Sequence, residues 1–287
     1  MLVKSYCDSN PGTESRKVHF TRYVPFPRLS LSHSGTNTYL IGTGKKRLLL
    51  DTGEGLTAYE PLLSSVLQSE DCTISAVLLS HWHHDHVGGI PQVTKLSPGV
   101  SFSKFRTDED SELLPIRDGD VFAVEGATLR AVHTPGHTTD HTVFYVEETG
   151  ELFTGDSILG QGTAVFENLS TYISSLKKQL ALNPKIIYPG HGPVIGGNNA
   201  AVEKIQQYIS HRQQREDEVV KVMKDKGPDV EISPRDIVEV IYAKYPQSLW
   251  PAAERGIVLH LEKLKDEGKA TEGSKGKWVL TSAQSSL

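Results

Sequence analysis

Six consecutive positions, His81 to His86, hold four histidines and one aspartate in the sequence HWHHDH. In an extended segment, side chains two positions apart project to the same side, so His81 and His83 can grip one ion. Asp85 and His86 come where the chain is expected to turn into a helix, so they point elsewhere and can serve a second ion. Neutral imidazole and carboxylate are ligand types that Zn²⁺ favours, and iron and manganese also accept them. The cluster predicts a metal centre.

An isolated histidine is more often a surface residue or a satisfied core group than a ligand. Histidines this close together would repel one another when protonated, whereas a bound cation holds them neutral, which disfavours the purely structural interpretation. His84 falls out of the ligand series and is expected to form a wall of the site. Trp82 is bulky and apolar and is expected to pack rather than bind.

Further potential ligands stand directly after predicted strands. Glycine accompanies each of them and lets the backbone bend sharply toward a metal. The spacing does not choose among His133, His137 and His141, which lie four residues apart. The three segments that can complete two coordination shells are Thr134–His137 (TPGH), Thr154–Asp156 (TGD) and Tyr188–Gly192 (YPGHG).

Asp51 ends another predicted strand, in the sequence Asp-Thr-Gly. An aspartate there can accept the remaining N–H of a ligand histidine and so fix its tautomer. It can equally cap a turn. Both interpretations of Asp51 stay open on the sequence alone.

Short apolar runs bounded by Gly, Asp and Asn predict strands, and amphipathic stretches between them predict helices over Tyr59–Gln68 and Ser170–Leu182. This pattern is typical of sheets covered by helices rather than of an all-β sandwich. The predicted strands are Thr38–Ile41, Arg47–Asp51, Ile74–Ser80, Val121–Val124, Thr128–His133, Thr142–Val146, Leu152–Thr154 and Lys185–Tyr188.

The C-terminal part of the chain predicts a separate unit. A long helix over about 199–224 is stopped by Lys226-Gly227-Pro228, and its Arg212 and Arg215 are expected on an ordinary solvated face. Ser233-Pro234 makes a good helix start, Ile257 opens a second apolar face, and a hairpin follows. Helix, helix and hairpin outline a winged helix, so we expect a catalytic domain over 1–226 and a winged-helix domain over 227–287.

The composition is that of an ordinary globular protein with 287 residues, 37% apolar and 23% charged. A formal net charge of -5 gives no general attraction to nucleic acid or anionic lipid. The 2 cysteines favour a reducing compartment over a disulfide framework. We find no secretory signal or membrane-spanning run, and so expect a soluble intracellular protein, cytoplasmic or mitochondrial, with no membrane partner.

The order H-x-H-x-D-H, TPGH, TGD and PGHG resembles the metallo-β-lactamase superfamily. The resemblance implies an α/β (α+β) fold, a four-layered αββα sandwich, and a site for two zinc ions, with iron or manganese as alternatives. It also selects His137 from its neighbours. The implied ligands are His81, His83 and His137 for the first ion, Asp85, His86 and His191 for the second, and Asp156 bridging both.

A closer resemblance, to the group of beta-lactamase-like protein 2 and its fungal lactamase-like relatives, rests on segments such as Gly35–Leu40, Asp51–Glu54 and Gly162–Glu167. The winged-helix tail fits this group too. Animal members are described as endoribonucleases acting on single-stranded RNA, and fungal relatives include thioesterases that release polyketides from a carrier protein. The strip Ser30–Ser34 departs from the group, which usually has an NPG-containing stretch and a Leu-Gln pair there.

The expected mechanism uses hydroxide activated between two metal ions roughly 3.5–4 Å apart. Asp85 is expected to orient that hydroxide and handle its proton, with His191 beside the developing oxyanion. We expect an acyl-thioester hydrolase whose partner is a thioester or an acyl carrier protein. An endoribonuclease acting on single-stranded RNA is the alternative. It ranks second because aromatic and basic residues are not interleaved as a strand-binding groove requires. A hydroxyacylglutathione hydrolase and an inactive metal-stabilised binding module are less favoured.

Overall fold

We describe a computed structural model of the chain, in which residues 20–23, 35–106, 113–227 and 229–281 are placed well enough to describe. The strip Ser30–Ser34 lies outside these residues. The described part forms two six-stranded mixed sheets and one small two-stranded sheet.

The first sheet has its six strands in chain order, and β3, β4, β5 and β6 run parallel to one another up to the edge at β6. Its strands are β1 (Phe20–Tyr23), β2 (Thr38–Ile41), β3 (Lys46–Leu50), β4 (Thr73–Leu79), β5 (Ser101–Phe105) and β6 (Leu114–Ile116). The second sheet runs in the order β12-β11-β10-β9-β8-β7. Its strands are β7 (Val121–Val124), β8 (Ala127–His133), β9 (Thr142–Val146), β10 (Glu151–Gly155), β11 (Ile186–Pro189) and β12 (Ile195–Gly196).

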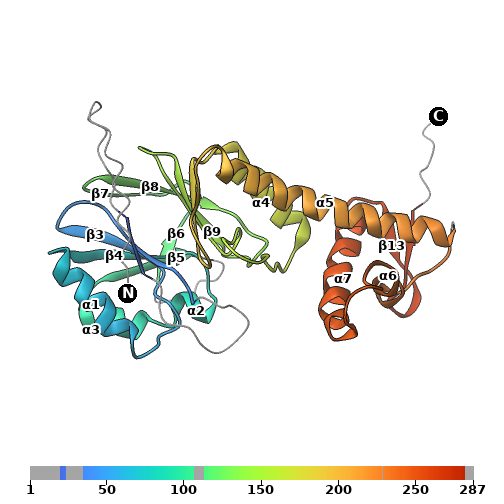
Figure 1. The fold of residues 1–287 in the computed structure, drawn as a ribbon, viewed down its shortest axis with the longest axis horizontal. Helices are drawn as coiled ribbons and strands as arrows, with labels where there is room; N and C mark the ends of the chain where they lie inside the picture. The colour runs from blue at the N-terminus through green and yellow to red at the C-terminus, as the bar shows by residue number, and fades with distance from the viewer. Residues whose placement is uncertain (1–19, 24–34, 107–112, 228, 282–287) are drawn as a thin grey trace.

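The two sheets face each other across an apolar core, and helices cover both outer faces (Figure 1). Helices α1 (Tyr59–Ser69) and α3 (Ile90–Leu96) cover the first sheet, and α4 (Leu169–Ala181) with the start of α5 (Ala200–Lys226) covers the second. The layers are therefore helix, sheet, sheet and helix, which confirms the predicted sandwich.

Side-chain alternation explains why the strands of the first sheet are apolar at nearly every position. Leu48 and Leu50 of β3 enter the core between the sheets, whereas Leu49 enters the core under α1 and α3. Leu78 of β4 likewise points opposite to Val77. Successive side chains of a strand lie on opposite faces, so a sheet covered on both faces needs a continuous apolar run.

The C-terminal unit consists of α6 (Pro234–Ile241), α7 (Trp250–Asp266) and a hairpin of β13 (Ala270–Glu272) and β14 (Trp278–Leu280). Ser233 caps α6: its Oγ accepts from the Asp236 N–H at 3.1 Å, and the Asp236 carboxylate accepts from the Ser233 N–H at 3.0 Å. This is a capping box at the predicted helix start. Helix α7 begins at Trp250, ahead of the apolar face predicted from Ile257, and Pro251 fits its first turn.

Helix α5 contributes to two cores. Near its start, Ile205 and Tyr208 pack with the helical layer over the second sheet, whereas Val219 and Met223 pack with α6 and α7. We propose that α5 rigidly joins the catalytic and winged-helix domains, with the boundary after residue 226. None of the helices in the described ranges has the length and apolarity needed to cross a lipid bilayer.

The face between α5 and α7 holds buried polar groups. Lys263 of α7 pairs with Glu216 of α5 at 2.7 Å, and both side chains are nearly inaccessible to solvent. His260 of α7 is 3% exposed. Burial lowers the pKa of His260 to about 3, and the positive charges of Arg212, Arg215, Lys263 and a protonated His211 act in the same direction.

This neutral His260 predicts a pH-dependent contribution to stability. Above pH 6.5, its ordinary pKa, neither state binds the proton; below it the unfolded chain does and the folded chain does not until about pH 3. Stability is therefore lost as pH falls from 6.5 towards 3, by about 1.4 kcal/mol at pH 5.5. Urea unfolding at pH 7.5 and 5.5 should show this loss in the wild-type chain and a smaller loss in His260→Gln. Equal losses in both would contradict the assignment.

Candidate metal centre

Loops from four strand ends meet at one edge of the two sheets and bring the predicted ligands together. His81 and His83 follow β4, and a short helix α2 (His84–Val87) begins directly after them, which turns Asp85 and His86 in another direction. The other ligands come from the second sheet: His137 between β8 and β9, Asp156 after β10, and His191 after β11. The seven side chains form two neighbouring groups, His81, His83, His137 and Asp156, and Asp85, His86 and His191.

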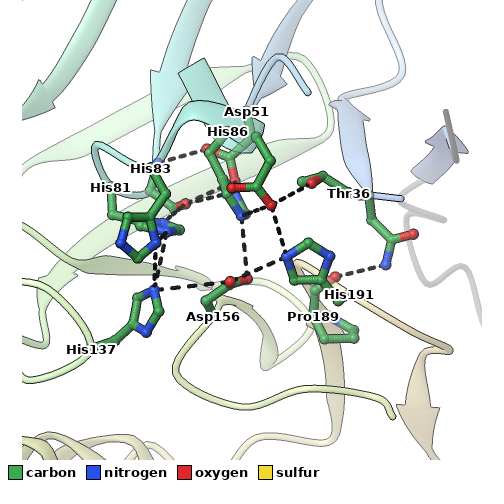
Figure 2. A network of polar contacts seen from close by, with 12 residues as sticks. Thr36, Asp51, His81, His83, His86, His137, Asp156, Pro189 and His191 are labelled. Carbon is green, nitrogen blue, oxygen red and sulfur yellow. Dashed lines mark hydrogen bonds and ion pairs between the residues drawn. The ribbon is translucent and has the colours of Figure 1, made fainter. Parts of the chain in front are cut away.

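In the first group three imidazole nitrogens face one another (Figure 2). His81 Nε2 lies 3.0 Å from His83 Nδ1, and His137 Nε2 lies 3.2 Å from the former and 3.1 Å from the latter. Three nitrogens in mutual contact cannot all be satisfied by protons between them. These N···N distances are close to the separation of about 3.3 Å between two ligand atoms of a tetrahedral zinc ion with bonds near 2.0–2.1 Å.

In the second group His191 Nε2 lies 3.1 Å from Asp85 Oδ2, and His86 Nε2 lies 3.6 Å from the same oxygen. Asp156 stands between the groups. Its Oδ1 is 3.3 Å from His86 Nε2, while its Oδ2 is 3.2 Å from His191 Nε2 and 3.9 Å from His137 Nε2. The carboxylate of Asp156 can therefore reach an ion in either group.

Hydrogen bonds on the far side of two rings fix their tautomers. His137 Nδ1–H donates to the Val165 carbonyl and His86 Nδ1–H to Asp51 Oδ2, both at 2.8 Å. Neutral His137 therefore presents an Nε2 lone pair to the centre, and His86 would do so once a cation replaces the proton on its Nε2. His86 Nε2 and Asp156 Oδ1 are buried and 3.3 Å apart, but neither forms a well-aligned hydrogen bond. Buried polar atoms are rarely left this way, and a cation between them would satisfy both, so the residues present fit metal ions.

Of the two roles that the sequence left open for Asp51, the structure shows the acceptor of a histidine N–H rather than the turn cap. Its carboxylate accepts from His86 and also from the Ser80 N–H at 2.7 Å and the Ser80 hydroxyl at 2.8 Å. The Ser80 hydroxyl is also 2.9 Å from His81 Nδ1. Asp51 thus positions side chains of both groups through one buried network.

Burial and mutual repulsion lower the pKa of His81 and of His137, so these rings are neutral. Burial alone would also lower the pKa of His191, but hydrogen bonds to Asp156 and Asp85 raise it to about 9. Burial would raise the pKa of Asp156, yet the charge of His86 and the hydrogen bond from His191 lower it. Without metal, protonated His86 and His191 supply the positive charge that balances the neighbouring carboxylates.

Of the three equally spaced histidines, the structure brings His137 alone into the groups. His133 stacks on Phe105 with ring centroids 3.6 Å apart. His141, which the sequence did not single out, is fully buried; its Nε2 accepts from the Asp156 N–H at 3.2 Å, and its Nδ1–H donates to the Thr134 hydroxyl at 2.9 Å. It therefore holds the backbone of Asp156 in place.

Gly190 shows why the late motif requires glycine beside its histidine. A Cβ at this position would lie 2.4 Å from Asp156 Oδ1 and 2.9 Å from His86 Cε1. The backbone of Gly190 is also bonded on both sides, to Gly155 O and to the Asn37 N–H, each at 2.7 Å. The close approach to the ligands predicted for this glycine is present.

Trp82 was expected to pack, but it contacts His83 and leaves about half of its surface exposed rather than entering the core. Its side chain is 51% exposed, and its ring centroid lies 4.5 Å from that of His83. Val165, whose carbonyl contacts His137, is 70% exposed. Two large apolar side chains therefore lie open to solvent beside the first group of ligands. His84, expected to form a wall, is exposed.

Comparison with known families gives two matches. Residues 32–191 match the model of the metallo-beta-lactamase superfamily, and residues 233–278 match that of the beta-lactamase associated winged helix domain. The first match spans more than half of the chain and contains all seven side chains of the two groups.

Similar proteins come from animals, fungi and bacteria. The chain is 45% identical over 254 residues to the beta-lactamase-like protein 2 homolog of Drosophila melanogaster, covering 84% of this chain and 85% of that protein. It is 43% identical over 204 residues to the atrochrysone carboxyl ACP thioesterase of Aspergillus fumigatus, covering 71% of this chain and 47% of that protein. A solved beta-lactamase domain protein from Burkholderia ambifaria has the same fold, with a TM-score of 0.74, 17% identity and 96% of each chain covered.

Motif order, layered fold and these matches agree, and the chain belongs to the metallo-beta-lactamase superfamily, with a C-terminal winged-helix domain.

Proposed function

We propose that this metallo-beta-lactamase-type hydrolase cleaves acyl thioesters and requires two divalent metal ions. The observation that carries the metal requirement is the convergence of seven donor side chains in two adjoining groups, with buried acceptor atoms left unpaired. Zinc suits these nitrogen and oxygen donors, and iron and manganese accept the same set.

The residues divide naturally between two ions. His81, His83 and His137 would hold one, Asp85, His86 and His191 the other, and Asp156 would contact both. When bound, such ions acidify water and polarise a carbonyl oxygen.

Asp85 is the ligand candidate best placed to move a proton. Its side chain is 37% exposed, whereas His86 beside it is buried. Burial would raise the pKa of Asp85, but the hydrogen bond from His191 and the charge of His86 bring it well below its usual range. The Thr36 hydroxyl donates to Asp85 Oδ2 at 2.9 Å and orients it. The lowered pKa keeps Asp85 ionised but makes it a weak base in the metal-free protein, so its proposed role rests on its exposure and orientation: it can take a proton from the attacking water and return it to the leaving group.

A thiol is a leaving group that suits this arrangement. In thioester hydrolysis, water adds its oxygen to the acyl carbon, the C–S bond breaks with its electron pair on sulfur, and the released proton neutralises the thiolate. Thiols have a pKa of about 8.5, so the sulfur departs near neutral pH with little help from an acid. One aspartate can serve the whole proton transfer.

The apolar rim of the site favours an acyl substrate. Exposed Trp82 and Val165 adjoin the ligands His83 and His137 and can cover an aliphatic or aromatic acyl chain. A relative named as an ACP thioesterase supports a substrate presented on an acyl carrier protein. Single-stranded RNA is the competing substrate, and its cleavage is an outcome of the assay below.

Metal content tests the two-ion requirement. Protein purified with zinc should contain close to two equivalents, and chelation should lower both activity and the thermal midpoint, since bound metal stabilises the folded state. His83→Ala should lose one equivalent and more than about 100-fold in hydrolysis. His84→Ala, a change at the exposed neighbour, should keep both. Full activity in chelated protein would disprove the requirement.

A paired substrate assay tests the thioester proposal. Acyl-CoA or acyl carrier protein thioesters and a labelled single-stranded RNA are offered to the same preparation and to Asp85→Asn. We expect thioester hydrolysis that falls by about 100-fold or more in the variant, in which the proton acceptor is lost. RNA cleavage that disappears in Asp85→Asn, together with inert thioesters, would replace the proposal with an endoribonuclease.

Trp82 provides a test of acyl recognition. Trp82→Ala should raise KM for long-chain or aromatic acyl thioesters by about tenfold, the value of roughly 1.4 kcal/mol of apolar contact, and leave acetyl thioesters nearly unchanged. Trp82→Phe should recover part of the loss. An equal effect on short and long acyl chains would show that Trp82 does not contact the acyl group.

A further inference from the structure

The segment between β10 and α4 contributes an acceptor to the metal centre. The Val165 carbonyl accepts the Nδ1–H of His137 and thereby directs Nε2 toward His81 and His83. The Val165 side chain is exposed, so packing of that side chain does not hold the carbonyl in place. Its position must come from the residues on either side of it.

Arg212 of α5 holds both sides of this carbonyl. Its Nη2 donates to the Thr163 hydroxyl at 2.9 Å and to the Ala164 carbonyl at 3.0 Å. Its guanidinium carbon lies 4.9 Å from the ring centroid of Phe166 and 5.9 Å from that of Tyr172. Arg212 therefore contacts residues on both sides of Val165 in the sequence.

Arg212 is not on a solvated helix face, as the sequence had indicated, because it is only 9% exposed. Among the described residues no carboxylate forms an ion pair with it, and its Nε is buried without a hydrogen-bond partner. A buried charge without a counter-ion costs stability, so an apolar residue would fill this space better if packing were the only need. Only the planar guanidinium group of arginine can donate to a hydroxyl and a carbonyl and lie over an aromatic ring at the same time.

The same stretch of α5 is covered by the winged-helix domain. Glu216, one turn beyond Arg212, pairs with Lys263 of α7, and Leu259 of α7 packs on the layer that contains Tyr172. Helix α7 thus packs on the same stretch of α5 that carries Arg212.

We propose that Arg212 is a positioning residue of the metal centre: it fixes residues 163–166 so that the Val165 carbonyl sets the orientation and tautomer of His137. This rests on the proposed role of His137 as a metal ligand, while the contacts between Arg212 and the segment do not.

The test compares Arg212→Gln and Arg212→Lys with Arg215→Gln. Arg215 is a matched control on the same helix: it pairs with Glu218 at 2.8 Å and lies over the Tyr242 ring, and its hydrogen bonds and ion pairs in the described structure do not reach residues 163–166. The probes are Zn²⁺ and Co²⁺ alone, titrated against a chelating dye, and the NMR signal of the His137 Nδ1–H in metal-free protein.

In Arg212→Gln we expect one of the two metal equivalents to bind about 10–100-fold more weakly, as for loss of a group that orients a ligand. The His137 Nδ1–H should exchange faster, the Co²⁺ spectrum should change, and kcat should fall more than KM rises. Arg212→Lys should not rescue these properties, because lysine lacks the planar guanidinium group. Arg215→Gln should resemble the wild type in all of them.

Thr163→Val is the second variant, in case Arg212→Gln does not fold. It removes one acceptor and leaves the Ala164 carbonyl, so the same changes should appear in smaller size. Wild-type metal binding and wild-type His137 exchange in a folded Arg212 variant would overturn the inference. A wild-type chain that binds two metals but leaves thioesters intact would instead overturn the proposed substrate.

Discussion

The burial of several ionisable side chains at one sheet edge is the constraint on which the rest of the structure depends. Imidazole nitrogens at 3.0–3.2 Å from one another, with two carboxylates beside them, are unfavourable without cations between them. The surrounding framework therefore has to hold them in place. The Asp51 and Ser80 network, the His141 contact to Asp156 and the Arg212 contact to residues 163–166 are three separate parts of that framework.

The two-sheet architecture makes this convergence possible. The first sheet contributes the histidine-rich loop and Asp51, and the second contributes His137, Asp156 and His191. Backbone contacts join the sheets at this edge, for example the Thr142 N–H to Ser80 O at 2.8 Å and the Asn37 N–H to Gly190 O at 2.7 Å. The centre lies across the junction of the sheets, so its geometry depends on how they pack.

Local pattern was sufficient to predict much of the fold. Strands β2, β7 and β9 agree with the predicted ranges, and the capped start of α6 was visible in Ser233-Pro234. The strand β5 was missed because its one buried position holds a polar residue, Ser103, and its two phenylalanines are only partly buried, so Ser101–Phe105 has no apolar run. Such segments resemble loops until their neighbours are known.

The candidate ligands could be proposed because histidine and aspartate beside glycine are chemically conspicuous. The supporting residues were less visible. Thr36, His141 and Arg212 act through hydrogen bonds to residues 49, 15 and 48 positions away in the sequence, and nothing in their local pattern indicates such partners. Trp82 was misjudged for a related reason, since an aromatic residue beside a ligand looks the same in sequence whether it faces the core or the solvent.

Helix α5 has a consequence for how the molecule can be divided. If the chain were cut after residue 226, the apolar side chains of Val219, Val222 and Met223 would be exposed to solvent along the C-terminal end of α5. The isolated winged helix would in turn lose one wall of its interior. Neither fragment made in this way would be self-sufficient, so a separable catalytic piece would need a shortened helix or new polar residues at those positions.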